Sequence, residues 1–84
     1  MDELPRRILI TGAAKRLGAV MAEAMAAAGF DVAIHCHRSL DAAAALARRI
    51  EALGRRATVV QADLASEAET AGVVPRASEA LGPL

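Results

Sequence analysis

Residues 11–18, TGAAKRLG, have the composition of a loop that receives phosphate at the start of a helix. Phosphate groups bind at helix N-termini because the first backbone N–H groups point out of the helix there. Glycine is needed in such a loop where φ is positive or where a Cβ would block the ligand, and Gly12 and Gly18 are placed to meet these needs. Their six-residue offset matches neither the G-x-G-x-x-G loop nor the P-loop. A tight turn without a ligand therefore remains the alternative.

Three short apolar segments predict the strands that position this loop. None of them alternates with polar residues, which is typical of strands buried on both faces of a parallel sheet. The segments are Ile8-Leu9-Ile10, Val32-Ala33-Ile34 and Ala57-Thr58-Val59-Val60. A helix is expected after each, so the order is β-α-β-α-β-α, which implies right-handed crossovers and an α/β fold with a parallel sheet.

Apolar periodicity and capping residues predict the three helices. The first has its expected core stripe at Leu17, Val20, Met21, Ala24, Met25 and Ala28 and ends at Gly29. The second has its stripe at Ala43, Leu46, Ala47, Ile50 and Leu53 and ends at Gly54. Ser66 and Glu69 form a capping box for the third. Pro75 lies inside that pattern and predicts a kink or break near Val74.

The composition limits the possible functions. At 84 residues the chain is at most one small domain, and its net charge of +0 does not suggest a nucleic-acid or membrane partner. The single Cys36 has no partner for an internal disulfide, and no metal-type cysteine spacing exists. The N-terminal residues resemble neither a signal peptide nor a membrane span. We expect a cytoplasmic protein.

Three motifs resemble one protein family. Thr11-Gly12-x-x-x-Arg16-x-Gly18 is similar to the TGxxxGxG loop of short-chain dehydrogenases/reductases. The form TGAAKRLG, the later HCHRS and the QADL that follows the third strand resemble the pteridine reductase branch in particular. The resemblance covers nearly the whole chain. It implies a Rossmann-type parallel three-layer sandwich, of which residues 1–84 would be the N-terminal portion, and a dinucleotide cofactor.

The resemblance also assigns roles within the first loop. It implies that Gly12, Arg16, Leu17 and Gly18 contact the cofactor. Arg16 would reach over the dinucleotide from the rim of the loop, where a guanidinium pairs with phosphate or stacks on adenine. The alternative is a solvent-exposed arginine at the first position of the helix. Lys15 is equally compatible with phosphate steering and with simple exposure.

The residues after the second strand favour NADP over NAD. An NAD site places a carboxylate about 20 residues beyond the glycine motif to bind the ribose hydroxyls, and none occurs here before Asp41. His37, Arg38 and Ser39 offer the cations and the hydroxyl that a 2′-phosphate needs. Ordinary loop polarity is the alternative. His35 is either a further contact or an interior histidine whose hydrogen bonds are satisfied.

Asp63 and Leu64 follow the third strand. By resemblance, the Asp63 carboxylate accepts a hydrogen bond from the adenine amino group, and Leu64 offers its backbone N–H to the ring. The alternative for Asp63 is that it caps a turn.

The chemistry of this family depends on a Tyr-x-x-x-Lys motif, which this chain does not contain. It has no tyrosine, and Lys15 is its only lysine, so no catalytic residue is assigned. We expect the cofactor-binding part of an NADP(H)-dependent oxidoreductase that reduces a carbonyl or pterin-type small molecule, acting as a homo-oligomer. The alternatives are a 3-oxoacyl-carrier-protein reductase fragment and a self-contained nucleotide-binding or regulatory module.

Overall fold

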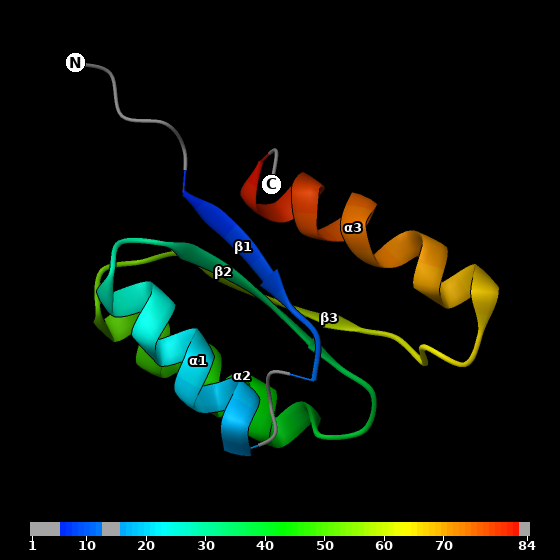
Figure 1. The fold of residues 1–84 in the computed structure, drawn as a ribbon, viewed down its shortest axis with the longest axis horizontal. Coiled ribbons are helices and arrows are strands. Elements are labelled where there is room, and N and C mark those ends of the chain that lie inside the picture. The colour runs from blue at the N-terminus through cyan, green and yellow to red at the C-terminus, as the bar shows by residue number, and fades with distance from the viewer. Residues whose placement is uncertain (1–5, 13–15, 83–84) are drawn as a thin grey trace.

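A computed structural model describes residues 6–12 and 16–82 of the chain. Strands and helices alternate along it (Figure 1). The elements are β1 (Arg7–Ile10), α1 (Arg16–Ala27), β2 (Asp31–Cys36), α2 (Leu40–Ala52), β3 (Ala57–Gln61) and α3 (Glu67–Leu81). The order predicted from the sequence is therefore confirmed.

The three strands form one parallel sheet in the order β1-β2-β3. In its register Ile8 pairs with Val32, and Val32 pairs with Ala57. The middle strand β2 is buried along almost its whole length, which explains its continuous apolar sequence. The outer edge of β1 has no strand beside it among the described residues.

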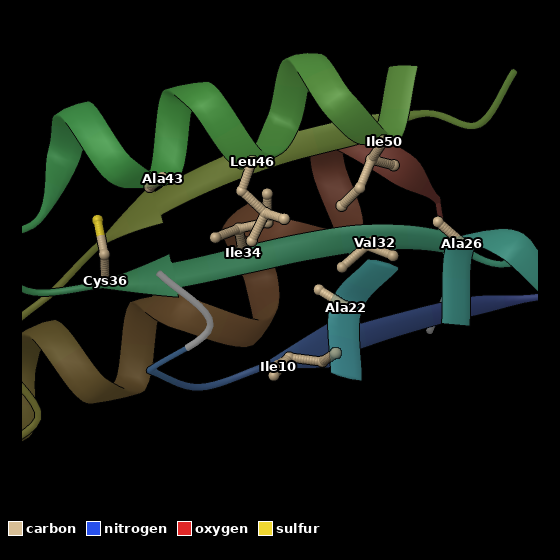
Figure 2. Close-up of a cluster of buried hydrophobic side chains, with 9 residues drawn as sticks. All are labelled: Ile10, Ala22, Ala26, Val32, Ile34, Cys36, Ala43, Leu46 and Ile50. Carbon is tan, nitrogen blue, oxygen red and sulfur yellow. The ribbon is translucent and has the colours of Figure 1, made fainter. Parts of the chain in front are cut away.

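Helices cover both faces of the sheet, so the fold has three layers. Figure 1 shows α1 and α2 against one face and α3 against the other. Side chains of β2 alternate between the faces: Val32, Ile34 and Cys36 belong to the core under α1 and α2, whereas Ala33 belongs to the core under α3. Figure 2 shows the first of these cores, where Leu46 and Ile50 of α2 point toward the sheet. The Rossmann-type arrangement is confirmed.

The predicted core stripe of α1 is wrong at its first three positions, although Met25 packs partly buried against the core. The side chains of Leu17, Val20 and Met21 are 74%, 65% and 51% exposed, while Ala22 and Ala26 are buried. The helix sequence RLGAVMAEAMAA is apolar on nearly every side, so its periodicity does not single out one face. Small residues let the helix approach the sheet closely, which selects the alanine face and leaves the larger side chains exposed.

Pro75 does not break α3, so the break that the sequence allowed near Val74 is absent. The helix runs from Glu67 to Leu81 with Pro75 inside it. Pro75 lies on the exposed side, so the carbonyl that loses its N–H partner there faces water. Val73 and Ala77 on either side of it are buried in one core, and this shared packing holds both halves of the helix against the sheet.

The other helix predictions agree with the structure, with one exception each. Ala43, Leu46 and Ile50 of α2 are buried, but Leu53 is half-exposed. At the start of α3, the Ser66 hydroxyl accepts a hydrogen bond from the Glu69 N–H at 3.3 Å. The Glu69 carboxylate does not return to Ser66 but accepts from the N–H of Asp63, so the capping box is extended into the preceding loop.

Candidate functional site

A cleft of about 380 Å³ lies where the carboxyl ends of the three strands meet. Ligands of open α/β sheets bind at this edge. The cleft brings together four residues predicted from the sequence, Gly12, His37, Asp63 and Leu64. Thr11, His35 and Ala65 complete its lining.

Leu17 and Gly18 lie beside a second hollow. It has a volume of about 480 Å³ and runs along the outer edge of β1. Leu17 and Gly18 of α1 line it together with Met21, and Gly12 borders both hollows. Gly12 therefore stands between the cleft that holds His37 and Asp63 and an apolar groove.

Gly12 occupies a conformation that few other residues adopt. Its φ is +65°, and an L residue is strained there. A Cβ built at this position would meet no described atom within 4 Å. The requirement for glycine is therefore conformational, because the chain must turn sharply out of β1 toward the helix.

Arg16 is the first residue of α1 and is exposed. This position agrees with the alternative that Arg16 is a solvent-exposed arginine at the first position of the helix. Arg16 lines neither hollow. Its predicted place over a dinucleotide stays a prediction. Lys15 lies outside the described residues, as do Ala13 and Ala14.

His37 and Asp63 face each other across the ends of β2 and β3. The His37 Nε2 atom lies 3.8 Å from the Asp63 Oδ2 atom, and both side chains are partly exposed. Gln61 fixes the backbone of this loop by donating a hydrogen bond from its Nε2 atom to the His37 carbonyl oxygen at 3.1 Å. Sequence reasoning did not find the role of Gln61, because its partner is a backbone atom 24 residues away.

Arg38 and Ser39 form the exposed end of the same loop. Ser39 is the N-cap residue of α2, yet its side chain makes no capping hydrogen bond. Among the described residues, no side chain pairs with the Arg38 guanidinium. Both polar groups therefore stand at a helix N-terminus with their hydrogen-bonding capacity available, although neither lines the cleft.

Asp63 caps a turn, which is the alternative that the sequence left open. Its Oδ1 atom accepts a hydrogen bond from the Ala65 N–H at 2.9 Å. This contact occupies one carboxylate oxygen and leaves Oδ2 on the side of His37. The Leu64 side chain is 47% exposed, and its N–H donates to no other described residue. A contact of Asp63 and Leu64 with adenine stays a prediction.

His35 is an interior histidine with both ring nitrogens satisfied. It is 4% exposed, its Nδ1 atom accepts from the Gly12 N–H at 3.0 Å, and its Nε2 atom lies 2.9 Å from the Ala62 carbonyl oxygen. The neighbouring Cys36 is also buried. Burial raises the pKa of the Cys36 thiol.

Two other kinds of feature are absent from the described part of the chain. Within it, no group of three or more His, Cys, Asp or Glu side chains could hold a metal ion. No helix in these residues has the length and apolar character needed to span a bilayer.

Comparison with known proteins shows the family. Residues 6–84 match the family model of the short chain dehydrogenases. Pteridine reductase 1 of Leishmania tarentolae is 48% identical over 73 residues, which cover 80% of this chain and 25% of that protein. The 3-oxoacyl-[acyl-carrier-protein] reductase FabG of Aggregatibacter actinomycetemcomitans is 37% identical over 75 residues, which cover 89% of this chain and 31% of that protein.

Among solved structures, FolM alternative dihydrofolate reductase 1 from Brucella canis, complexed with NADP, superposes with a TM-score of 0.88. It is 47% identical, and the match covers 94% of this chain and 32% of that protein. The chain thus spans between a quarter and a third of the length of these relatives. Because the family model matches nearly the whole sequence and the fold agrees, the chain belongs to the short-chain dehydrogenase family.

Proposed function

We propose that this chain is the cofactor-binding part of an NADP(H)-dependent oxidoreductase that reduces a carbonyl or pterin-type substrate. The observation that carries the proposal is the loop between β2 and α2. It exposes His37, Arg38 and Ser39 at the N-terminus of a 13-residue helix and has no carboxylate before Asp41. Cations, a hydroxyl and a helix N-terminus together suit a 2′-phosphate. A carboxylate in this loop would instead suit the free ribose hydroxyls of NAD.

The rest of the cleft has groups that fit the other parts of such a cofactor. Asp63 offers an acceptor and Leu64 a free N–H for the adenine edge. Gly12, Arg16, Leu17 and Gly18 surround the start of α1, whose N-terminus suits a pyrophosphate. These nine residues, including those of the β2–α2 loop, form the proposed cofactor site.

This chain contains residues that can bind the cofactor but no residue for proton donation. When bound, the nicotinamide supplies the hydride. The residues described above would bind and orient the dinucleotide, but none of them donates the proton that the reduced substrate needs. The family uses a tyrosine for that step, and this chain has none. We therefore place proton donation on a part of the complete protein outside residues 1–84.

Three relatives suggest two different substrates. The 48% identity with a pteridine reductase and the 47% identity with a dihydrofolate reductase of the same fold support a pterin-type substrate. The match to FabG at 37% supports a 3-oxoacyl thioester as the second candidate. The family match favours either over a self-contained regulatory module.

Assembly and location are part of the same proposal. The exposed apolar side chains of Leu17, Val20 and Met21, next to the open edge of β1, need a covering surface. The remaining part of the protein and the other subunits of a homo-oligomer would provide it. The single buried thiol of Cys36 suits a reducing compartment such as the cytoplasm.

The test uses the protein from the full reading frame that contains this chain. We expect NADPH to be oxidised with a dihydropterin at a kcat/KM well above that with a 3-oxoacyl thioester, and NADH to be used poorly with either. Preference for the thioester would replace the first substrate by the second candidate. The absence of NADPH binding would refute the cofactor assignment itself.

A further inference from the structure

His35 joins two loops that the sheet itself does not connect. Its imidazole contacts Gly12 after β1 and Ala62 after β3. Because β2 lies between them, β1 and β3 share no backbone hydrogen bonds. Within the described residues, the buried imidazole is therefore the polar link between the two loops that border the cleft.

The two hydrogen-bond partners of the imidazole determine which ring nitrogen carries the hydrogen. The Gly12 N–H is a donor, so Nδ1 must present a lone pair to it. The Ala62 carbonyl is an acceptor, so Nε2 must carry the hydrogen. Only the neutral Nε2–H tautomer satisfies both contacts. The protonated form would place two N–H groups against each other at Gly12.

This contact also determines which backbone groups remain for a ligand. The Gly12 N–H is directed at His35 and is not available to a phosphate. Gly12 itself has a φ of +65° and lines the cleft together with His35. The imidazole thus fixes the position of Gly12 at the border of the cleft.

We propose that His35 is a positioning residue for the cofactor. Its Nε2–H tautomer holds the Gly12 turn in the orientation that receives the dinucleotide phosphates. The inference rests on the proposed function for the identity of the ligand, NADPH, but the geometry that it uses belongs to this chain alone. His35 itself need not touch the cofactor.

Two substitutions separate the contacts of the imidazole. In His35→Asn the amide oxygen is bonded to Cγ as Nδ1 is, so it can accept from Gly12, while the Ala62 carbonyl loses its donor. In His35→Gln the amide nitrogen takes the place of Nε2 and can donate to Ala62, while the Gly12 N–H loses its acceptor. The Ala62 contact is buried and the Gly12 contact is partly buried, so a merely structural role predicts that His35→Asn is at least as harmful as His35→Gln.

The expected result is unequal. In the full-length protein, we expect His35→Asn to keep the NADPH dissociation constant within about threefold of wild type and His35→Gln to raise it by about tenfold or more. Both should lower Tm, and His35→Asn should lower it at least as much as His35→Gln, because it leaves the more deeply buried group unpaired. Equal losses of affinity in the two variants would overturn the proposal, as would a larger loss in His35→Asn.

A second measurement needs no variant and applies if either substitution prevents folding. Long-range ¹⁵N–¹H correlation spectra of the wild-type protein identify the imidazole tautomer, and hydrogen exchange reports the protection of the Gly12 N–H. We expect the Nε2–H tautomer and a protected amide. An Nδ1–H tautomer or an unprotected Gly12 amide would overturn the proposal. If wild type does not bind NADPH, the proposed function fails; if it binds and the tautomer is wrong, only the role of His35 fails.

Discussion

The Nε2 atom of His37 lies 3.8 Å from the Oδ2 atom of Asp63, across the carboxyl ends of β2 and β3. A residue expected near the 2′-phosphate and one expected near the adenine therefore stand side by side. This arrangement matches the connectivity of an adenosine 2′-phosphate, in which one ribose separates the base from the phosphate. Substitutions can therefore separate the contribution of the 2′-phosphate to cofactor affinity from that of the adenine.

Asp63→Ala should weaken NADPH and NADH equally, because both cofactors contain adenine. The loss of the adenine acceptor and of the Ala65 hydrogen bond should cost about 1 kcal/mol each, so we expect both dissociation constants to rise by at least about fivefold. Titration calorimetry with both cofactors measures this. The matched variant Asp63→Asn keeps an acceptor oxygen and should retain most of the affinity. A change confined to NADPH would show that Asp63 acts on the phosphate and not on the base.

Arg16→Gly tests whether the first residue of α1 reaches the cofactor. If the guanidinium lies over the dinucleotide, its removal should raise the NADPH dissociation constant by about tenfold. The fold should persist, because Arg16 is exposed and glycine is the usual residue at this place in the family loop. Arg16→Gln is the matched variant, since it removes the charge without the helix penalty of glycine. Unchanged affinity in both would establish Arg16 as a solvent-exposed arginine.

Cys36 should make the stability of the protein depend on pH. Burial raises the pKa of its thiol in the folded state, so folding favours the neutral form. Its contribution to the free energy of unfolding is fully present below the ordinary thiol pKa of about 8.5 and is lost as pH rises through the folded-state pKa. Urea unfolding of wild type and Cys36→Ala at pH 7 and above pH 10 measures this. We expect the stability difference between the two proteins to shrink at high pH, whereas a constant difference would contradict the burial argument.

The 84-residue chain expressed alone should associate with itself and show no reductase activity. The inactivity follows from the absence of tyrosine. The association follows from the exposed side chains of Leu17 and Met21 beside the open edge of β1. Sedimentation velocity should show oligomers, and Leu17→Gln/Met21→Gln should reduce them.

Leu53→Gln/Val74→Gln is the matched control for this experiment. Leu53 and Val74 are 52% and 53% exposed but do not border the groove along β1. This control should leave the association unchanged. A monomeric wild-type chain with a sharp cooperative thermal transition would show that the three strands are sufficient as a domain.

The strands and their order could be predicted because burial on both faces leaves a continuous apolar segment. Each such segment here became a strand of the sheet, and β2, the strand with neighbours on both sides, is buried most completely. The face of α1 could not be predicted in the same way. When alanine, leucine, valine and methionine surround a helix, the face that becomes buried depends on how closely the helix backbone packs on the sheet. In α1, Ala22 and Ala26 allow the closest approach.

Part of the lining of the cleft could be predicted from residue types and their positions. Gly12, His37, Asp63 and Leu64 were identified by type and position, and the cleft brings them together. The contacts of His35 were not predictable. Its partners are the backbone N–H of one residue and the backbone carbonyl of another, 23 and 27 positions away. Every residue except proline has both groups, so no sequence pattern marks them.

The central claim is that the loop after β2 selects NADP(H), and the ratio of the NADH and NADPH dissociation constants of the full-length protein tests it most directly. A charge-assisted contact of Arg38 with the 2′-phosphate should contribute about 1.5–3 kcal/mol, so NADPH should bind at least about tenfold more tightly. Arg38→Asp should reverse the preference, because a carboxylate repels the phosphate and can bind the ribose hydroxyls. Arg48→Asp, at an exposed position on α2, should leave the ratio unchanged. Equal dissociation constants for NADPH and NADH in the wild-type protein would contradict the account.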